Sequence, residues 1–506
     1  MNRYAHFFLL ALVVLIPASL ALAASDAVAT QQELQREYIE AGAGGDKVRI
    51  LVMPGHEPEY GGAEYQGFYE REIVVEIADQ LAGYLEQNQE YEVIVARSNL
   101  AWHEDLEEYF EEEWRDIEKF VERAKRAFNR AVRKGDISLP NEEETVSHNA
   151  APSDVALRLY GISKWANEND IDLVLHLHVN DTTDHGPNDP SKHSGFTLYV
   201  PDSQYGNGEV STDLAEALFP RLHAMQASST LPIEDKGIVQ SQDLIAIGAF
   251  DTLTIPSVLI EYGYITEPKF TAPEVRTTMT KDFAYETYLG VQDFMGDSIV
   301  SRFATAALPF TFTQTPTVGS SSPEAYALQA ALAQKGFYPA ATTTGATTTM
   351  RTRTECPISG QMNPCTVDAI SAFQKAQGWN PTGALGPMTL AALNREFGTS
   401  LAATVVPEAN VATTTPATPA GSCVLTRQLE LKATDATTSN QVSVLQTLLA
   451  KDTTVYPSGQ VTGFFGPATL NAVQAFQVKN AIVQEGGAGY GKVGPKTREA
   501  LLKTCS

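Results

Sequence analysis

Apolar runs alternate with amphipathic segments between residues 47 and 300. The runs VRILVMP, YEVIVARS, IDLVLHLHVND, GFTLYV and IPSVLIEYGYI are typical of buried strands. Between them, EREIVVEIADQL, DVALRLYGISKWANEND and STDLAEALFPRLHAM repeat apolar residues at helical spacing. A chain that alternates in this way is expected to form an α/β domain of three layers, with a sheet between helices.

A long charged segment, about residues 102–145, interrupts this alternation. Its apolar residues form a stripe at helical spacing, and they are Leu106, Phe110, Trp114, Ile117, Val121, Ala124 and Phe128. Acidic residues fill the first half of the expected helix and basic residues fill the second, which suits the helix dipole. The segment is interpreted either as a helix packed on the flank of the domain, with a solvated charged face, or as a lid that regulates the site.

Two C-terminal units resemble each other and follow segments without hydrophobic periodicity. FTFTQTPTVGSSSP and TVVPEANVATTTPATPAGS are rich in Thr, Pro, Ala and Ser, and they predict linkers at 301–321 and 399–421. In the unit 322–398, LQAALAQKGFYP and TVDAISAFQKAQ correspond to LQTLLAKDTTVYP and TLNAVQAFQVKN in the unit 422–506. Each unit is expected to be a small all-α domain of three helices, and a duplicated unit on linkers favours targeting by avidity.

The composition indicates a folded protein of about three domains that does not bind nucleic acid. The chain has 506 residues, of which 43% are hydrophobic and 19% are charged, and this length exceeds what one core organises. The formal net charge of −25 argues against nucleic acid, because phosphates are bound by basic residues. No G-x-x-x-x-G-K-[ST] or G-x-G-x-x-G motif occurs, so no phosphate-binding loop is predicted.

The N-terminus is typical of an export signal. Arg3 precedes the apolar run FFLLALVVLIPASLALA, and Ala21-Leu22-Ala23 is an A-x-A cleavage site. The alternative is an uncleaved membrane anchor. No later stretch is apolar for long enough to span a bilayer. We therefore expect a signal peptide over residues 1–23, a linker over 24–46, and an exported protein, periplasmic or secreted to the cell wall, without stable membrane association.

Four cysteines fit an oxidising compartment. Cys356 and Cys365 bracket the short loop CPISGQMNPC, and Cys423 and Cys505 bracket nearly all of the last unit. Of the three pairings that four cysteines allow, we predict disulfides 356–365 and 423–505. A zinc site is the other interpretation, although no C-x-x-C pair or nearby histidine supports it.

Metal-type ligands stand at three separated positions of the α/β region. His56 comes just after the strand VRILVMP, Glu70 opens the first helix, and His178 lies at the end of IDLVLHLHVND. Two histidines and one glutamate with an open fourth position form a catalytic zinc arrangement. Glu261, in VLIEYG, ends a further strand, where a carboxylate can exchange a proton with zinc-bound water.

These motifs, in this order, resemble those of the zinc-dependent N-acetylmuramoyl-L-alanine amidases. ILVMPGH resembles the family's strand that ends in a metal-binding histidine, EREIVVEIADQL its E-K-x-x-x-L-x-I-A helix, LHVN its S-I-H-A-N motif, and IPSVLIEYGYITEP its P-x-V-L-V-E-x-G-F-x-x-N-P motif. The resemblance spans about residues 47–297 and implies a mixed central sheet. It also implies Zn²⁺ held by His56, Glu70 and His178, with Glu261 as the catalytic carboxylate.

The resemblance further implies a reaction and a partner. Members of this family hydrolyse the amide bond between N-acetylmuramic acid and the L-alanine of the peptidoglycan stem peptide. The two C-terminal units resemble the peptidoglycan-binding domain through L-Q-x-x-L followed by T-x-x-A-[IV]-x-x-F-Q. A zinc peptidase of similar fold, which would cut stem peptides or cross-links, and a non-catalytic peptidoglycan-binding protein are the alternatives. A regulatory protein partner is left open.

Four further residues are candidates for supporting the site or lining its cleft, and they are His176, Asn180, Glu57 and His185. His176 shares a strand face with His178, at a position where the family typically has serine, so it is expected to support the site or to pack in the core. Glu57 stands where the family usually has glycine. Met53 stands where it has aspartate, which removes an acceptor that would orient a ligand.

Overall fold

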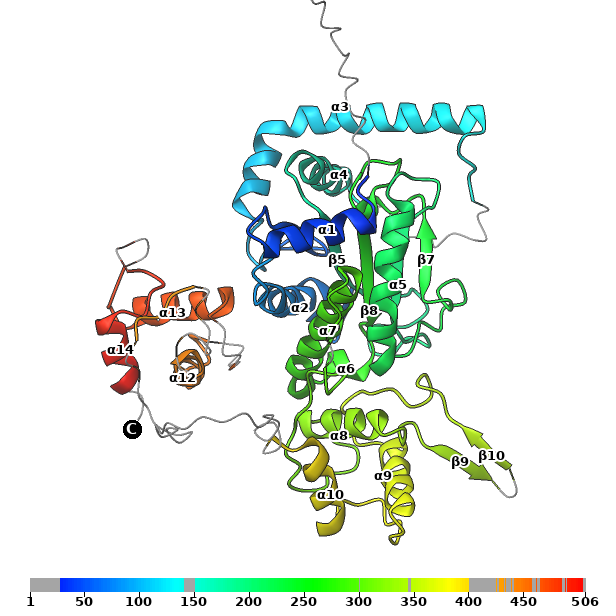
Figure 1. Cartoon of the computed structure of the whole chain (residues 1–506), viewed down its shortest axis with the longest axis vertical. Coiled ribbons are helices and arrows are strands. Elements are labelled where there is room, and N and C mark those ends of the chain that lie inside the picture. Colours follow the sequence, from blue (N-terminus) through cyan, green and yellow to red (C-terminus); the bar gives the residue numbers. More distant parts are fainter. Residues whose placement is uncertain are drawn as a thin grey trace, which may run out of the picture.

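The computed structural model describes residues 28–140, 151–299, 301–344 and 347–399. It also describes 425–503 except for 426, 432, 434–437, 439–440, 457–460, 462–464, 485–486 and 488. The predicted signal peptide and nearly all of the predicted linker 399–421 lie outside these residues. Within them, an α/β domain is followed by two helical modules (Figure 1). We call these the first module (residues 322–398) and the second module (residues 422–506). No helix in the described part of the chain is both long enough and apolar enough to cross a membrane.

The α/β domain is built on a six-stranded sheet. Its strands are β1 (Val48–Pro54), β4 (Tyr91–Val95), β5 (Leu173–Asn180), β6 (Thr197–Pro201), β7 (Ile238–Ser241) and β8 (Ser257–Tyr264). The order is β4-β1-β5-β8-β6-β7, and β6 runs antiparallel to β8 whereas the other neighbours are parallel. The predicted mixed central sheet is confirmed. A separate hairpin, β2 (Glu64–Tyr65) and β3 (Phe68–Tyr69), lies between β1 and the first helix of the sheet.

Helices cover both faces of this sheet, which makes three layers (Figure 1). One layer contains α2 (Glu70–Leu85), α5 (Gly208–Met225) and α7 (Pro273–Phe294), with the short α6 (Pro268–Thr271) before α7. The other contains α4 (Ser153–Glu168) and the 3₁₀ turn η2 (Ile245–Ile247). Side chains alternate across each strand. Ile50 and Val52 therefore pack on the face covered by α2, α5 and α7, and Leu51 and Met53 pack on the face covered by α4.

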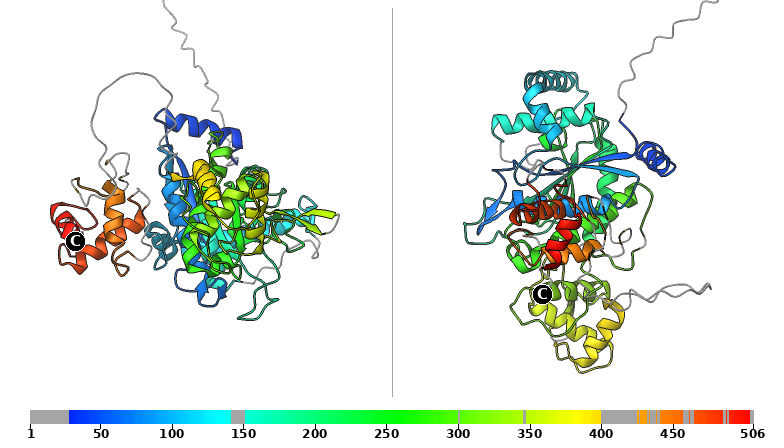
Figure 2. Two further views of the ribbon diagram at one scale, coloured as in Figure 1. Left: turned by 90° about the horizontal axis from the view of Figure 1, so that it is seen from below. Right: turned by 90° about the vertical axis from the view of Figure 1, so that its left-hand side faces the viewer.

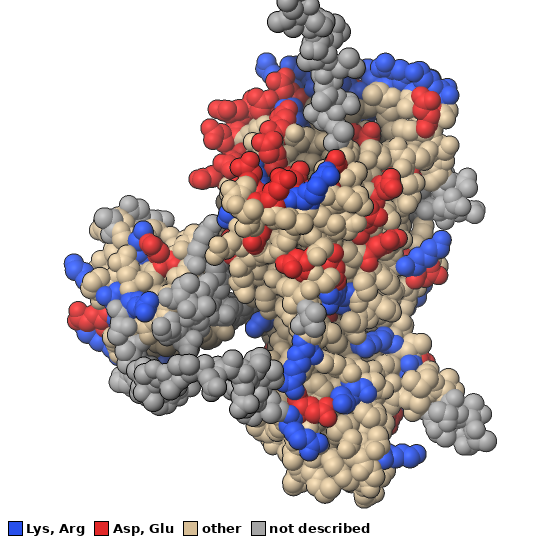
Figure 3. All heavy atoms as spheres, viewed as in Figure 1, with Lys and Arg blue, Asp and Glu red and all other residues tan. Residues whose placement is uncertain are grey.

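The charged segment forms one helix, α3 (Glu104–Lys134), which packs on α4. Leu106 and Ile117 of its apolar stripe are fully buried, and the Cβ that Gly161 of α4 lacks would lie 2.9 Å from Ile117 Cδ1. The missing side chain lets the two helices approach closely. Figure 3 shows acidic side chains gathered over one half of α3 and basic side chains over the other. The packing matches the first of the two interpretations, a helix on the flank of the domain.

The region predicted as the linker 24–46 differs from that prediction, because it contains a helix, α1 (Gln31–Gly42). Thr30 and Glu33 cap its first turn reciprocally. Leu34 is fully buried in the domain core, and Tyr38 donates a hydrogen bond to Asp297 Oδ2 over 2.8 Å. The helix is therefore fixed to the α/β domain through both apolar and polar contacts.

The first module consists of α8 (Pro323–Gln334), α9 (Pro364–Ala376) and α10 (Pro387–Phe397), with a hairpin of β9 (Ala341–Thr344) and β10 (Thr347–Met350). Its core is continuous with that of the α/β domain. The segment 301–321, predicted as a linker, also differs from the prediction because Phe303, Leu308 and Phe312 are buried in this shared core. Figure 2 (right) shows the first module and α3 at opposite ends of the α/β domain.

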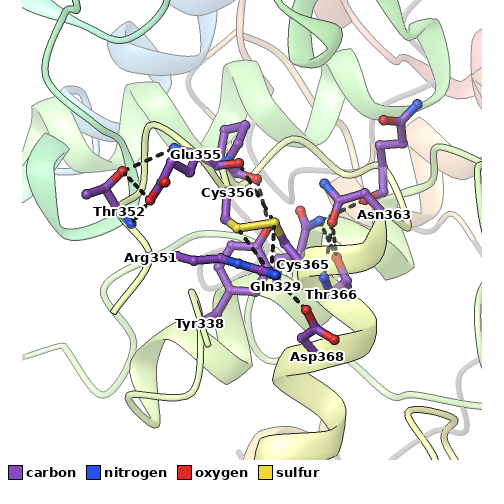
Figure 4. Close-up of a disulfide and its surroundings, with 12 residues drawn as sticks. Gln329, Tyr338, Arg351, Thr352, Glu355, Cys356, Asn363, Cys365, Thr366 and Asp368 are labelled. Carbon is purple, nitrogen blue, oxygen red and sulfur yellow. Dashed lines mark hydrogen bonds and ion pairs between the residues drawn. A yellow bond between two sulfur atoms is a disulfide. The ribbon is translucent and has the colours of Figure 1, made fainter. Parts of the chain in front are cut away.

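One predicted disulfide lies within the first module. Cys356 and Cys365 are joined by an S–S bond of 2.02 Å (Figure 4). The bond closes the loop before α9, and Arg351 lies beside it in an ion pair with Asp368 of 2.8 Å. This pairing is confirmed. Cys423 and Cys505, the other predicted pair, lie outside the described residues.

The second module has its own core. Its helices are α12 (Gln441–Leu449), α13 (Pro467–Lys479) and α14 (Pro495–Leu502). Leu429, Leu445, Phe465, Val473 and Leu501 are buried together in a cluster separate from the core of the first module. Within the residues that the structure describes, both modules therefore have the expected three helices, and the first shares a core with the α/β domain whereas the second does not.

Candidate metal centre

His56 lies immediately beyond β1, in a turn that brings its ring toward β5. Its φ of 70° is in the left-handed region, which non-glycine residues rarely adopt. The preceding Gly55 donates a backbone hydrogen bond to Leu177 O of β5 over 2.9 Å. A Cβ on Gly55 would lie 2.3 Å from His178 Cε1. Only glycine therefore lets the β1 turn approach the His178 ring this closely.

Glu70 is the first residue of α2, and its carboxylate is buried between the two histidines. Oε1 lies 3.0 Å from His178 Nδ1, and Oε2 lies 2.8 Å from His56 Nε2. The backbone amides of Ala63 and Val179 also donate to this carboxylate, over 2.8 and 3.0 Å. Burial alone would raise the pKa of Glu70, but the charges of both histidines and the hydrogen bond with His178 outweigh it and hold the pKa well below its usual range. Glu70 is therefore ionised at neutral pH.

The three donor groups fit a metal ion. One donor atom from each of His56, Glu70 and His178 lies within 4.8 Å of the other two. In the described part of the chain, no other group of three or more His, Cys, Asp or Glu residues brings its donor atoms together in this way. The contact of His56 Nε2 with Glu70 lacks hydrogen-bond geometry, which leaves this buried nitrogen without a hydrogen-bond partner. The His56 side chain is 28% exposed, against 5% for Glu70. Solvent therefore reaches the cluster at the side chain of His56 and hardly at Glu70.

Glu261 lies beside this cluster on the neighbouring strand. In the parallel register of β5 and β8, Glu261 is opposite His178, so the two side chains point to the same face. Its Oε2 is buried without a hydrogen-bond partner. Burial, followed by the nearby carboxylates Glu70 and Glu234, raises the pKa of Glu261 well above its usual range. The group can therefore carry a proton next to the cluster.

His176 is not part of the donor cluster. It is 2% exposed and lies opposite Leu259 of β8 and Met53 of β1. Burial, and then the charge of His178, lower the pKa of His176 to about 3, so the ring is neutral at physiological pH. His176 lies two residues before His178 on β5, and its ring is packed in the sheet.

The other three candidates have partners of their own. Glu57 is buried and forms an ion pair of 2.8 Å with Arg158 of α4. Asn180 donates to Glu234 Oε1 over 3.0 Å. His185 lies in the loop after β5, 2.7 Å from Asp181 Oδ1 and 2.8 Å from Gly186 O. None of the three belongs to the donor cluster, and Asn180 connects the end of β5 to a carboxylate that the sequence did not single out.

That carboxylate, Glu234, is fully enclosed beside Glu261. Its oxygens accept hydrogen bonds from the side chains of Asn180, Tyr199, Ser229 and Tyr264. The network joins β5, β6 and β8 at the end of the sheet that carries the site. Glu234 lies in the irregular segment LPIEDKG, where no periodicity or ligand spacing marks it, so only the folded structure reveals its position.

An α/β domain with two histidines, a glutamate and an adjacent protonatable carboxyl group is typical of metal-dependent hydrolases. Residues 135–293 match the family described as N-acetylmuramoyl-L-alanine amidase. Residues 321–393 and 438–501 match the family described as putative peptidoglycan binding domain. The chain therefore carries a domain of the N-acetylmuramoyl-L-alanine amidase family followed by two peptidoglycan-binding domains, as predicted. The amidase match includes His178 and Glu261 but begins after His56 and Glu70, which the fold brings to them.

The solved structures that match the chain include three amidases. The CwlD amidase from Clostridioides difficile, solved in complex with the GerS lipoprotein, is 17% identical, with 49% of this chain and 99% of that chain covered and a TM-score of 0.32. Ami1 from Mycobacterium smegmatis is 14% identical, with 50% and 99% covered and a TM-score of 0.33. AmiC2 of Nostoc punctiforme is 16% identical, with 50% and 99% covered and a TM-score of 0.31. No curated protein sequence matches the chain.

Proposed function

We propose that this protein is an exported, zinc-dependent enzyme that hydrolyses the amide bond between N-acetylmuramic acid and L-alanine in peptidoglycan. The observation that supports the metal-dependent chemistry is the convergence of His56, Glu70 and His178 beside Glu261. The amidase and peptidoglycan-binding matches support the substrate. In this proposal the two modules hold the wall polymer while the α/β domain cuts it.

The chain's own residues have separate roles. His56, Glu70 and His178 would hold Zn²⁺ through one nitrogen or oxygen each, with Glu70 further fixed by the amides of Ala63 and Val179. When bound, zinc supplies Lewis acidity toward the scissile carbonyl and makes water a better nucleophile. Glu261 takes the proton of the attacking water at its free Oε2 and returns it to the departing L-alanine amine.

Digestion of purified peptidoglycan, followed by mass spectrometry, tests the reaction. We expect free stem peptides that begin with L-alanine and glycan strands without peptides. Fragments cut within the stem or at cross-links would identify the protein as a peptidase and contradict the proposal. Binding to the wall without any released fragment would identify a non-catalytic wall-binding protein.

The variant Glu261→Gln tests the assignment of the proton carrier. We expect it to keep one zinc per chain after dialysis and to lose turnover by roughly 10²–10⁴-fold, because an amide cannot accept the proton. Metal content and release of stem peptides are measured on the same preparation. Wild-type rates of cleavage by Glu261→Gln would contradict the role of Glu261.

Export also belongs to this proposal, since a wall substrate lies outside the cytoplasm. The supporting features are the apolar segment after Arg3 and the Ala21-Leu22-Ala23 site, which lie outside the described residues. N-terminal sequencing of the protein recovered from outside the cytoplasm should begin at Ala24. Recovery of the intact N-terminus in the membrane fraction would instead support the uncleaved anchor.

A further inference from the structure

Arg97 is a fully buried cation just beyond β4, and its hydrogen bonds end on backbone carbonyls. Its side chain is 1% exposed. Nε donates to Pro54 O over 3.0 Å, Nη2 donates to Gly55 O and, over 3.1 Å, to Arg71 O, and Nη1 donates to Ser98 O over 3.1 Å. A planar guanidinium can satisfy several acceptors in a fixed fork, which an ammonium group cannot do.

Three of the four carbonyls that Arg97 contacts belong to the two segments that carry the proposed metal ligands. Pro54 and Gly55 form the turn that leads into His56, whose φ of 70° requires support. Arg71 follows Glu70 in the first turn of α2. One side chain thus joins the turn after β1 to the start of α2, and the distance between these segments sets where the His56 and Glu70 donor atoms meet.

Packing alone does not explain a cation at this place. Burying a charge is costly, and an apolar side chain of similar volume would fill the space without that cost. Burial lowers the pKa of Arg97 to about 10, so the group is still charged at neutral pH. Its backbone is paired with Trp102, whose ring packs edge-on against Phe110 of α3 at 5.4 Å. The charged helix therefore supports the strand end from which Arg97 reaches the site.

We infer that Arg97 is a positioning residue of the metal centre, whose guanidinium fixes the backbones of His56 and Glu70 at the separation that metal binding needs. This inference rests on the proposed zinc site but not on the identity of the substrate. Arg97 is 1% exposed, and its hydrogen bonds go to backbone carbonyls rather than to the donor side chains. It acts through the backbone on both sides of the cluster.

The test compares Arg97→Met and Arg97→Lys with Arg49→Met in the full-length mature protein. Met keeps most of the apolar stem and removes the donors, and Lys keeps the charge without the fork. Arg49 is the matched control because it also donates to a backbone carbonyl, Asn169 O, but at the opposite end of β1. For each protein we measure the Zn²⁺ dissociation constant by chelator competition, the visible spectrum of the Co²⁺-substituted site, and the thermal unfolding midpoint.

We expect Arg97→Met to raise the Zn²⁺ dissociation constant by about 10- to 100-fold and to alter the Co²⁺ spectrum, with Arg97→Lys intermediate. Arg49→Met should lower the unfolding midpoint while leaving zinc affinity within about twofold of wild type. Wild-type zinc affinity and Co²⁺ spectrum in both Arg97 variants would overturn the inference, as would an equal loss of affinity in Arg49→Met. If Arg97→Met does not fold, Arg97→Lys decides the question. Wild-type protein that binds zinc but releases no stem peptides would overturn the proposed reaction alone.

Discussion

At the scale of single residues, the site depends on a glycine, Gly55, because this residue has no side chain. Gly55 allows the turn after β1 to contact the His178 ring, because a Cβ there would lie 2.3 Å from Cε1. Contacts this short do not occur between real atoms, so any larger residue must displace either the turn or the ring. The distance between the His56 and His178 donor atoms is therefore sensitive to one methyl group.

We predict that Gly55→Ala lowers zinc affinity at least tenfold while the chain remains folded. Zinc binding is measured by chelator competition, and folding by circular dichroism. Gly386→Ala is the control, because nothing lies within 4 Å of its added Cβ and its φ of −66° suits alanine. Equal zinc affinity in the two variants would show that the Gly55 contact relaxes without affecting the site.

The candidate metal ligands and the proposed catalytic carboxyl group could be predicted from the sequence, but the residues around them could not. His56, Glu70, His178 and Glu261 follow recognisable strands and helices, and their residue types state their chemistry. Arg97 and Glu234 act through contacts with backbone carbonyls, hydroxyl groups and an amide from distant segments. Such contacts depend on the register of neighbouring strands and leave no spacing pattern in the sequence. These supporting residues therefore emerge only from the fold.

At the scale of elements, periodicity predicted five of the six strands of the sheet and the helices α2, α3, α4 and α5. It did not predict β7 or α7, and irregular segments were misjudged. The sequence Thr30 to Glu33 fits the capping-box pattern, and Leu34 and Tyr38 are four residues apart. The signal for α1 was thus present although a linker was predicted. The segment 301–321 gave no such signal, because its buried aromatic residues follow the shape of the core that they cover and have no period of their own.

We predict that Ile117→Ala lowers the free energy of unfolding by about 2–4 kcal/mol, because it opens a cavity between α3 and α4. Glu118→Ala, on the exposed side of the same helix, should change it by no more than about 0.5 kcal/mol. Denaturant unfolding of both variants measures the difference. Equal stabilities would mean that α3 is not anchored on α4, and the lid interpretation would regain support.

At the scale of the whole molecule, the first module and the α/β domain share buried polar groups as well as a core. Asp282 of α7 accepts hydrogen bonds from Tyr326 of α8 over 2.8 Å and from Thr305 over 2.7 Å. Burial raises the pKa of Asp282 to about 6, and these hydrogen bonds oppose the shift only in part. The junction between the two units therefore contains a carboxyl group that keeps its proton to a higher pH than an exposed aspartate does.

The pH dependence of stability should reveal this group. An unfolded Asp282 ionises near pH 4, whereas the folded one keeps its proton to about pH 6. The folded state therefore binds more protons in this window, and the stabilisation present below about pH 4 is lost as pH rises toward 6 and above. The shift corresponds to about 3 kcal/mol. Between pH 4 and pH 7.5, the free energy of unfolding of the wild type should therefore fall by about 3 kcal/mol more than that of Asp282→Asn. Denaturant unfolding at both pH values measures the difference. Parallel pH profiles would contradict this prediction.

Truncation should separate the two modules. A mature chain ending at residue 399 lacks only the second module, whose core is its own, and should unfold at nearly the same temperature as the α/β domain of the full chain. A chain ending at residue 299 loses Phe303, Phe312 and Tyr326 from the shared core and should unfold at a lower temperature or aggregate. Thermal unfolding and gel filtration measure both effects. Equal midpoints would mean that the shared core adds no stability.

The shared core between the first module and the α/β domain fixes the distance between the two units. Phe303, Phe312 and Tyr326 fix the two units to each other. Under the proposed function, a wall strand held by the first module would therefore meet the metal centre at one fixed distance and orientation. Cleavage positions along the polymer would then be selected by geometry as well as by chemistry.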